Sequence, residues 1–160
     1  MRPFIPVCAV GLLAIACGDR ESSWTMRPDR AGDVRLGAPA AEASAVPDTG
    51  CHYWRPAGAP PGVSYMIENG HVVRADVDSA GPRTAEGIGV GSTEAEIRSA
   101  YGQHLTVQLH KYQWEAGWRY FIYLPPDDSL NAIVFETDGK AVRTFRAGRR
   151  PQVQYVERCG

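Results

Sequence analysis

Four histidines are the side chains best suited to hold a metal ion or to move protons: His52, His71, His104 and His110. Zinc sites place such residues at short, regular spacings such as H-x-H or H-E-x-x-H, and no such pair occurs in the chain. His104 and His110 flank a run of alternating apolar residues, so only sheet geometry could bring them together. We expect structural or surface histidines and no metal site.

Nucleophilic and phosphate chemistry receive little support from the sequence. Gly87, Gly89 and Gly91 precede a predicted helix, but no lysine stands where a P-loop needs one, and no parallel strand follows. The chain has no G-x-S-x-G elbow, and Asp127-Asp128 directly follow two prolines, which is turn chemistry. We therefore predict a non-catalytic protein without a cofactor.

An aromatic cluster is the stronger candidate for binding. Two of its rings, Trp118 and Tyr120, would point to one face of a strand, and the next two, Phe121 and Tyr123, to the other. The cluster is either ordinary packing or a recognition face, on which Trp and Tyr are typical anchors. It holds six of the fifteen aromatic residues: Tyr112, Trp114, Trp118, Tyr120, Phe121 and Tyr123.

The last fifth of the chain is rich in arginine, with Arg143 and Arg146 nearest to the aromatic strand in the predicted sheet. These groups form either a solvated strand edge or a site for carboxylates or phosphates of a partner. One layer of helices can cover only one sheet face, so we expect one aromatic set to be exposed together with Arg143 or Arg146. The net charge of −1 argues against a general nucleic-acid binder.

The first residues have the pattern of an export signal. Arg2 precedes an uncharged, mostly apolar run of 13 residues from Phe4 to Ala16, which is too short to span a bilayer. The end of this run, Leu13-Ala14-Ile15-Ala16-Cys17, resembles the bacterial lipobox, in which the cysteine carries lipid; Ala14 stands where that motif usually has Leu. Ala14-Ile15-Ala16 also fits cleavage for ordinary secretion. We predict a signal peptide over 1–16, lipidation of Cys17 and attachment to the periplasmic face of the outer membrane, with a soluble secreted or periplasmic form as the alternative.

Two cysteines remain once Cys8 leaves with the signal and Cys17 carries lipid. Cys51 and Cys159 are 108 residues apart, and in an oxidising compartment they are most simply a disulfide. Two buried thiols are the alternative.

The local patterns predict an α+β fold with an antiparallel sheet and short helices on one face. Thr93 and Glu96 form a capping box for a helix that ends before Gly102. Asn69-Gly70 and Asp138-Gly139 are two-residue hairpin turns. Strands are predicted over 63–67, 72–77, 105–109, 118–124, 132–136 and 141–146.

Two stretches repeat within the chain. Val34–Ala43 aligns with Ile88–Ile97 at an offset of 54, and Tyr65–Arg74 aligns with Val134–Arg143 at an offset of 69. We therefore predict a tether over 17–30 and a domain over 31–160, built of two helix-plus-hairpin modules at 31–80 and 84–160.

Residues 87–102 resemble the G-φ-x-φ-G-x-T-x-x-E-φ-x-x-x-φ-G signature of the β-lactamase-inhibitor-protein-like fold. The same signature occurs in SmpA/OmlA outer-membrane lipoproteins of the barrel-assembly machinery. The resemblance implies two tandem modules, each a helical element on an antiparallel sheet. The tandem repeat, the pair Cys51/Cys159 and the longer second copy depart from the barrel-assembly lipoproteins, so a shared fold does not carry a shared role.

We expect an outer-membrane-anchored lipoprotein that acts as a binding or envelope-assembly module for a protein. The alternative is a lectin-like role in which Trp114, Trp118, Tyr120 or Tyr123 stacks on sugars in a groove lined by Asp, Asn and Gln. An envelope-polymer hydrolase is a third reading, which no residue pattern supports.

Overall fold

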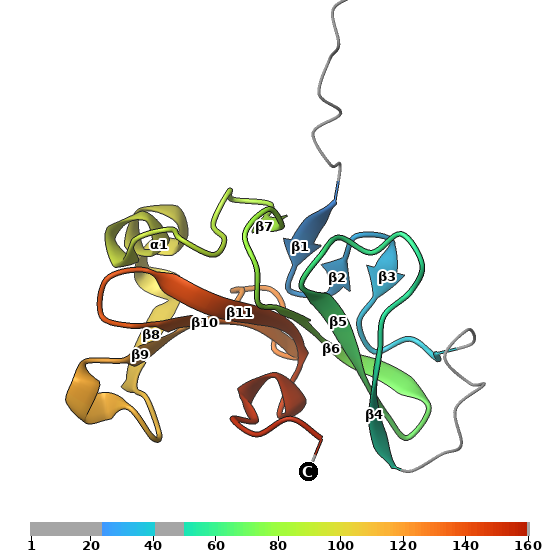
Figure 1. The fold of residues 1–160 in the computed structure, drawn as a ribbon. Coiled ribbons are helices and arrows are strands. Elements are labelled where there is room, and N and C mark those ends of the chain that lie inside the picture. The colour runs from blue at the N-terminus through green and yellow to red at the C-terminus, as the bar shows by residue number, and fades with distance from the viewer. Residues whose placement is uncertain (1–23, 41–49, 160) are drawn as a thin grey trace, which may run out of the picture.

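The computed structural model describes residues 24–40 and 50–159, and most of them surround one seven-stranded sheet (Figure 1). Its strand order is β4-β5-β6-β11-β10-β9-β8, and all neighbours pair antiparallel. The strands are β4 (Cys51–Trp54), β5 (Val63–Glu68), β6 (His71–Val77), β8 (Leu105–Leu109), β9 (Arg119–Tyr123), β10 (Asn131–Thr137) and β11 (Val142–Arg149). The predicted α+β class with an antiparallel sheet is confirmed.

The two predicted hairpin turns differ from each other. Asn69 and Gly70 both have positive φ, 50° and 73°, as a two-residue hairpin turn requires. The second turn runs over four residues, and in it the Asp138 carboxylate accepts the amides of Lys140 and Ala141 at 3.0 and 2.9 Å. In this turn Gly139 has positive φ, 86°, while Asp138 does not, so the two-residue prediction is wrong here.

Helix α1 (Glu94–Tyr101) begins at the predicted capping box. The Glu96 carboxylate accepts the amide of Thr93 at 2.6 Å, and the Thr93 hydroxyl accepts the amide of Glu96 at 3.2 Å. Ile97 and Tyr101 are buried against the sheet. Within the described residues α1 is the single α-helix, so the prediction of several short helices is wrong there; a first-module helix that continued past residue 40 would lie outside them.

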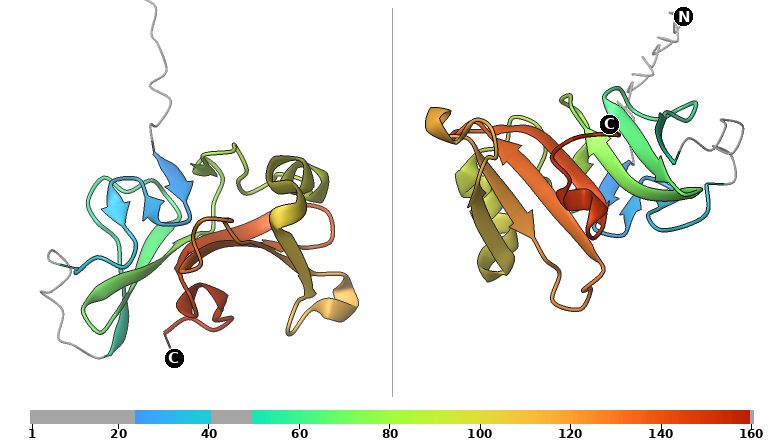
Figure 2. Two further views of the ribbon diagram at one scale, coloured as in Figure 1. Left: turned by 180° about the vertical axis from the view of Figure 1, so that it is seen from behind. Right: turned by 90° about the horizontal axis from the view of Figure 1, so that it is seen from below.

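A small second sheet lies on the same face of the large sheet as α1 (Figures 1 and 2). The predicted tether is wrong for residues 24–30, because Met26 is fully buried in the core and its strand pairs on both sides. Tyr65 of the large sheet donates its hydroxyl to the Ala31 carbonyl at 2.9 Å. The strands, in the order β3-β2-β1-β7, are β1 (Thr25–Arg27), β2 (Arg30–Ala31), β3 (Val34–Arg35) and β7 (Arg83–Thr84).

The opposite face of the large sheet is covered by residues 150–159, which we call the C-terminal strap (Figure 1). The strap contains the 3-10 turn Gln152–Gln154 and buries Val153 against a second apolar cluster that includes Tyr120, Ile122 and Val134. Cys159, at the end of the strap, forms the predicted disulfide with Cys51 of β4, and their Cα atoms are 5.5 Å apart.

Two buried arginines bind the strap through its main chain. Arg74 of β6 donates to the carbonyls of Gln152 and Tyr155 at 3.1 and 2.9 Å, and Arg146 of β11 donates to the Val153 carbonyl at 2.6 Å. These bonds hold the strap to the large sheet; the Gln152 carbonyl also accepts the Tyr155 amide at 3.1 Å within the strap's own turn. Both arginines are therefore structural.

Candidate binding surface

The rings of β9 alternate between the two faces as predicted, yet neither predicted set is exposed. Phe121 is 0% exposed beneath α1, and Tyr120 is 6% exposed on the strap side. The expectation of an exposed Trp118/Tyr120 or Phe121/Tyr123 set is therefore wrong. The physical reason is the strap, which covers the face that helices leave open.

Trp118 and Tyr123, the remaining ring of each predicted pair, are half-buried. Tyr123 packs on Tyr101 of α1 with 4.4 Å between ring centroids. Trp118 meets the ring of His110 edge to face at 5.6 Å. Both rings thus contribute to packing.

The two arginines assigned to binding differ from each other. Arg146 is 5% exposed and pairs with the Glu136 carboxylate, so its place in a binding surface is ruled out. Arg143 is exposed and donates to the Asp138 carboxylate through Nε and Nη2 at 2.8 and 2.5 Å. The pKa of Asp138 is lowered to about 2. The hydrogen bond from the Ala141 amide has the largest effect, and the bond from the Arg143 side chain comes next. Arg143 remains available at the surface.

The exposed apolar side chains gather before and within the β8–β9 connection. Among the described residues, four of the six exposed large hydrophobic side chains lie between 107 and 114. Tyr112 is 59% exposed and Trp114 is 53% exposed. We call residues 110–118, which join β8 to β9, the aromatic loop.

His110 holds the aromatic loop in one conformation. Its Nδ1 accepts the amides of Tyr112 and Gln113, both at 3.2 Å, so this nitrogen carries no proton and Nε2 carries it, 3.6 Å from the Glu136 carboxylate. The ring is buried and stacks on Tyr120 at 4.6 Å. Sequence reasoning identified His110 but missed this role, because it depends on the backbone path after the strand.

The far side of the loop is closed by a short turn and by the strap. Gly117 takes φ 87° and donates its amide to the Trp114 carbonyl at 3.0 Å, which ends the 3-10 turn Trp114–Ala116. The Glu157 carboxylate accepts the Tyr112 hydroxyl and the Lys111 ammonium. Both bonds lower the pKa of Glu157, and the bond from the Tyr112 hydroxyl has the larger effect. The loop is thus ordered in the free protein while Trp114 stays open to solvent.

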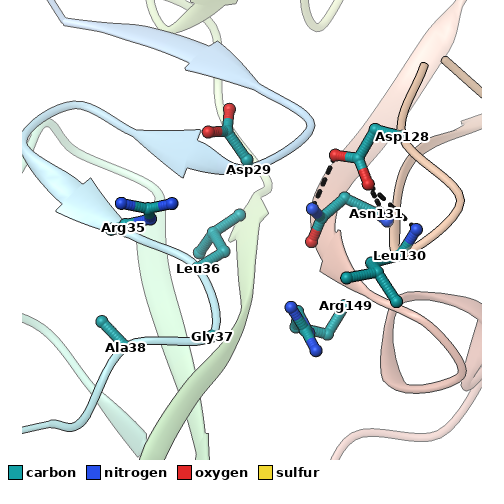
Figure 3. Close-up of a pocket in the computed structure, with 9 residues that line it drawn as sticks. All are labelled: Asp29, Arg35, Leu36, Gly37, Ala38, Asp128, Leu130, Asn131 and Arg149. Atoms are coloured by element: carbon teal, nitrogen blue, oxygen red, sulfur yellow. Dashed lines mark hydrogen bonds between the residues drawn. The ribbon is translucent and has the colours of Figure 1, made fainter.

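A separate polar cavity of about 390 Å³ lies at the other end of β10 (Figure 3). Its Asp128 carboxylate accepts the amides of Leu130 and Asn131 at 2.9 and 3.1 Å, which is the predicted turn chemistry. Asn131 begins β10, whereas the aromatic loop lies by the turn that follows it, so about 20 Å of strand separates the two. The cavity has no aromatic lining: Asp29, Arg35, Leu36, Gly37, Ala38, Asp128, Leu130, Asn131 and Arg149 form it.

Other classes of site are not assembled in the described part of the chain. Over residues 24–40 and 50–159, no three metal-ligating side chains of His, Cys, Asp or Glu come together. None of the helices there has the length and apolar character needed to cross a bilayer. Cys17 lies outside the described residues.

Comparison of the chain with protein-family models, with curated proteins and with solved structures finds no match.

Exchanging His110 for phenylalanine tests the locking of the loop. His110→Phe keeps a flat ring on Tyr120 but removes the acceptor of two amides, so we expect a loss of about 1–3 kcal/mol in the free energy of unfolding. Chemical denaturation measures the loss, and hydrogen exchange should quicken at the amides of Tyr112 and Gln113. His104→Phe, at an exposed position, is the control and should change little. Equal effects of the two exchanges would contradict the assigned role.

Proposed function

We propose that the chain is a secreted lipoprotein, anchored to the outer membrane through Cys17, that acts as a non-catalytic binding or assembly module for an envelope protein. The observation that carries this proposal is the aromatic loop, where Tyr112 and Trp114 are more than half exposed on a backbone fixed by His110 and Gly117. The anchor rests on the lipobox-like sequence that ends at Cys17.

An ordered loop with an exposed Trp is favourable for binding. A partner would bury this ring without the cost of ordering the backbone beneath it. Trp, Tyr and Arg are the residues that most often dominate the energy of protein interfaces. The exposed Arg143 borders the same end of the sheet, because Gly139 of its hairpin turn lies against the Gly117 carbonyl.

The proposed fold relationship is to β-lactamase-inhibitor-protein-like tandem modules. Its support is the topology: β4-β5-β6 and the longer β8-β9-β10-β11 are two antiparallel meanders joined through their last strands. The capping box of α1 lies where the resembling signature has it.

Carbohydrate recognition receives less support. Of the four rings named for that role, Trp114 is exposed, while Tyr120 is buried and Trp118 and Tyr123 pack on neighbouring rings. The cavity lined by Asp29, Asp128 and Asn131 is remote from Trp114. A second, smaller pocket joins Tyr120 with Gln108 and Gln154, but Trp114, Trp118 and Tyr123 do not line it.

Photo-crosslinking in intact cells tests the proposal. A photoreactive phenylalanine at position 114 should give one discrete crosslinked protein, and the same group at the exposed Leu130 should not. In purified form, Trp114→Ala should weaken that partner's binding by about 2 kcal/mol or more, with folding stability changed by less than about 0.5 kcal/mol. Identical crosslinks at both positions, or unchanged binding by Trp114→Ala, would refute the assigned surface. Fatty-acid labelling that persists in Cys17→Ser would refute the anchor.

A further inference from the structure

Strand β8 is an open edge of the large sheet. It is the last strand in the order, and over the described residues no strand pairs with its outer side. The Leu124 amide donates to the His104 carbonyl, and the His110 amide donates to the Trp118 carbonyl. Because main-chain groups alternate along an antiparallel strand, the N–H and C=O groups of Leu105, Val107 and Leu109 point outward.

This edge lacks the usual protection against pairing. Exposed edges are normally blocked by charges, proline or bulges, and Leu105–Leu109 contains none of these. Its register with β9 is unbroken over five pairs. Val107 and Leu109 lie on the face of Phe121, but the eight-residue α1 leaves both exposed.

We infer that β8 pairs antiparallel with β8 of a second copy of this chain, about a two-fold axis at Val107. The sequence Leu-Thr-Val-Gln-Leu is self-complementary in this register. Leu105 lies opposite Leu109 of the other copy, Val107 lies opposite itself, and Thr106 lies opposite Gln108. One face of the junction is then an apolar row and the other is polar, and each copy supplies the same surface, as a closed two-fold interface requires.

The charge pattern also fits a second copy. The five residues of β8 carry no charge, so two identical edges approach without repulsion between their side chains. The outward main-chain groups of one edge supply the donors and acceptors that the other lacks. The interface does not use Tyr112 or Trp114, so its test is independent of the test of the proposed binding surface.

Sedimentation equilibrium of the processed protein, with its disulfide intact, tests this pairing. The wild type should show a reversible monomer–dimer equilibrium. Val107→Lys and Val107→Glu each place like charges opposite each other and should raise the dissociation constant at least tenfold. An equal mixture of the two variants should restore the dimer as a heterodimer, because opposite charges then face each other.

Two further variants keep the test decisive. Val107→Pro removes an outward amide without breaking a bond to β9, and it should also dissociate the dimer. Gln108→Lys, on the opposite face and across from Thr106, should change the dissociation constant less than threefold. If the wild type stays monomeric at every concentration reached, the inference is overturned. Binding of an unrelated extended peptide to β8 would not rescue it, because the proposed occupant of this edge is a second copy of the chain. A dimer that survives Val107→Lys or Val107→Pro overturns it as well.

Discussion

Replacing Arg74 by methionine should lower the free energy of unfolding by about 3–5 kcal/mol, as expected when one partner of a buried ion pair is removed. Arg74 is 1% exposed, and its Nε donates to the Asp76 carboxylate at 2.9 Å. Its loss leaves Asp76 with the Tyr53 hydroxyl at 3.1 Å as a weaker partner. It also removes the bonds from Arg74 to the carbonyls of Gln152 and Tyr155, of which the Gln152 carbonyl keeps the Tyr155 amide.

Urea denaturation followed by tryptophan fluorescence measures this loss. Arg143→Met is the matched control, because its ion pair with Asp138 is exposed and should contribute less than about 1 kcal/mol. The double variant Arg74→Met/Asp76→Leu should recover part of the loss, since it no longer buries a charge without its main partner. If Arg74→Met were no more harmful than Arg143→Met, the structural role of Arg74 would be wrong.

Removal of the disulfide should have an effect of similar size. The bond between Cys51 and Cys159 closes a loop of 108 residues, for which loop-closure entropy gives a stabilisation of about 4–5 kcal/mol as an upper figure. Cys51→Ser/Cys159→Ser should therefore unfold at a much lower denaturant concentration than the oxidised wild type.

The comparison needs a control for side-chain effects. Reduced wild type should unfold like the double serine variant, because both lack the same covalent link. Hydrogen exchange should quicken first in the strap, at Gln152–Gln154, while the amides of β10 and β11 remain protected. Coincident unfolding curves for oxidised and reduced protein would contradict a stabilising disulfide.

The elements that sequence predicted well are those specified by local chemistry. The capping box of Thr93 and Glu96 and the turn at Asn69-Gly70 need only residues close in the chain. The strand at Leu105–Leu109 has the predicted bounds because its residues alternate. By contrast, the two-residue strands β2 and β3 are too short for any periodicity, although Pro28-Asp29 and Gly32-Asp33 are turn signals.

The candidate site was less predictable because exposure depends on long-range packing. Whether Tyr120 is open or covered is decided by the strap, more than thirty residues later. Val153 and Val156 are the sequence signal that could have indicated a buried strap. A buried arginine such as Arg146 has the same local pattern as a solvated one, so its role becomes visible only once the Val153 carbonyl is placed.

The early start of the fold limits how far the protein can stand from a membrane. If Cys17 carries lipid, six residues separate the anchor from Trp24, and even a fully extended chain from Cys17 to Trp24 reaches only about 25 Å. The side of the molecule that carries β1 then stays close to the lipid head groups. The aromatic loop and the strap lie on the far side of the sheet from β1 (Figure 1), so an anchor in the periplasmic face of the outer membrane would leave Trp114 directed away from that membrane, toward partners in the periplasm.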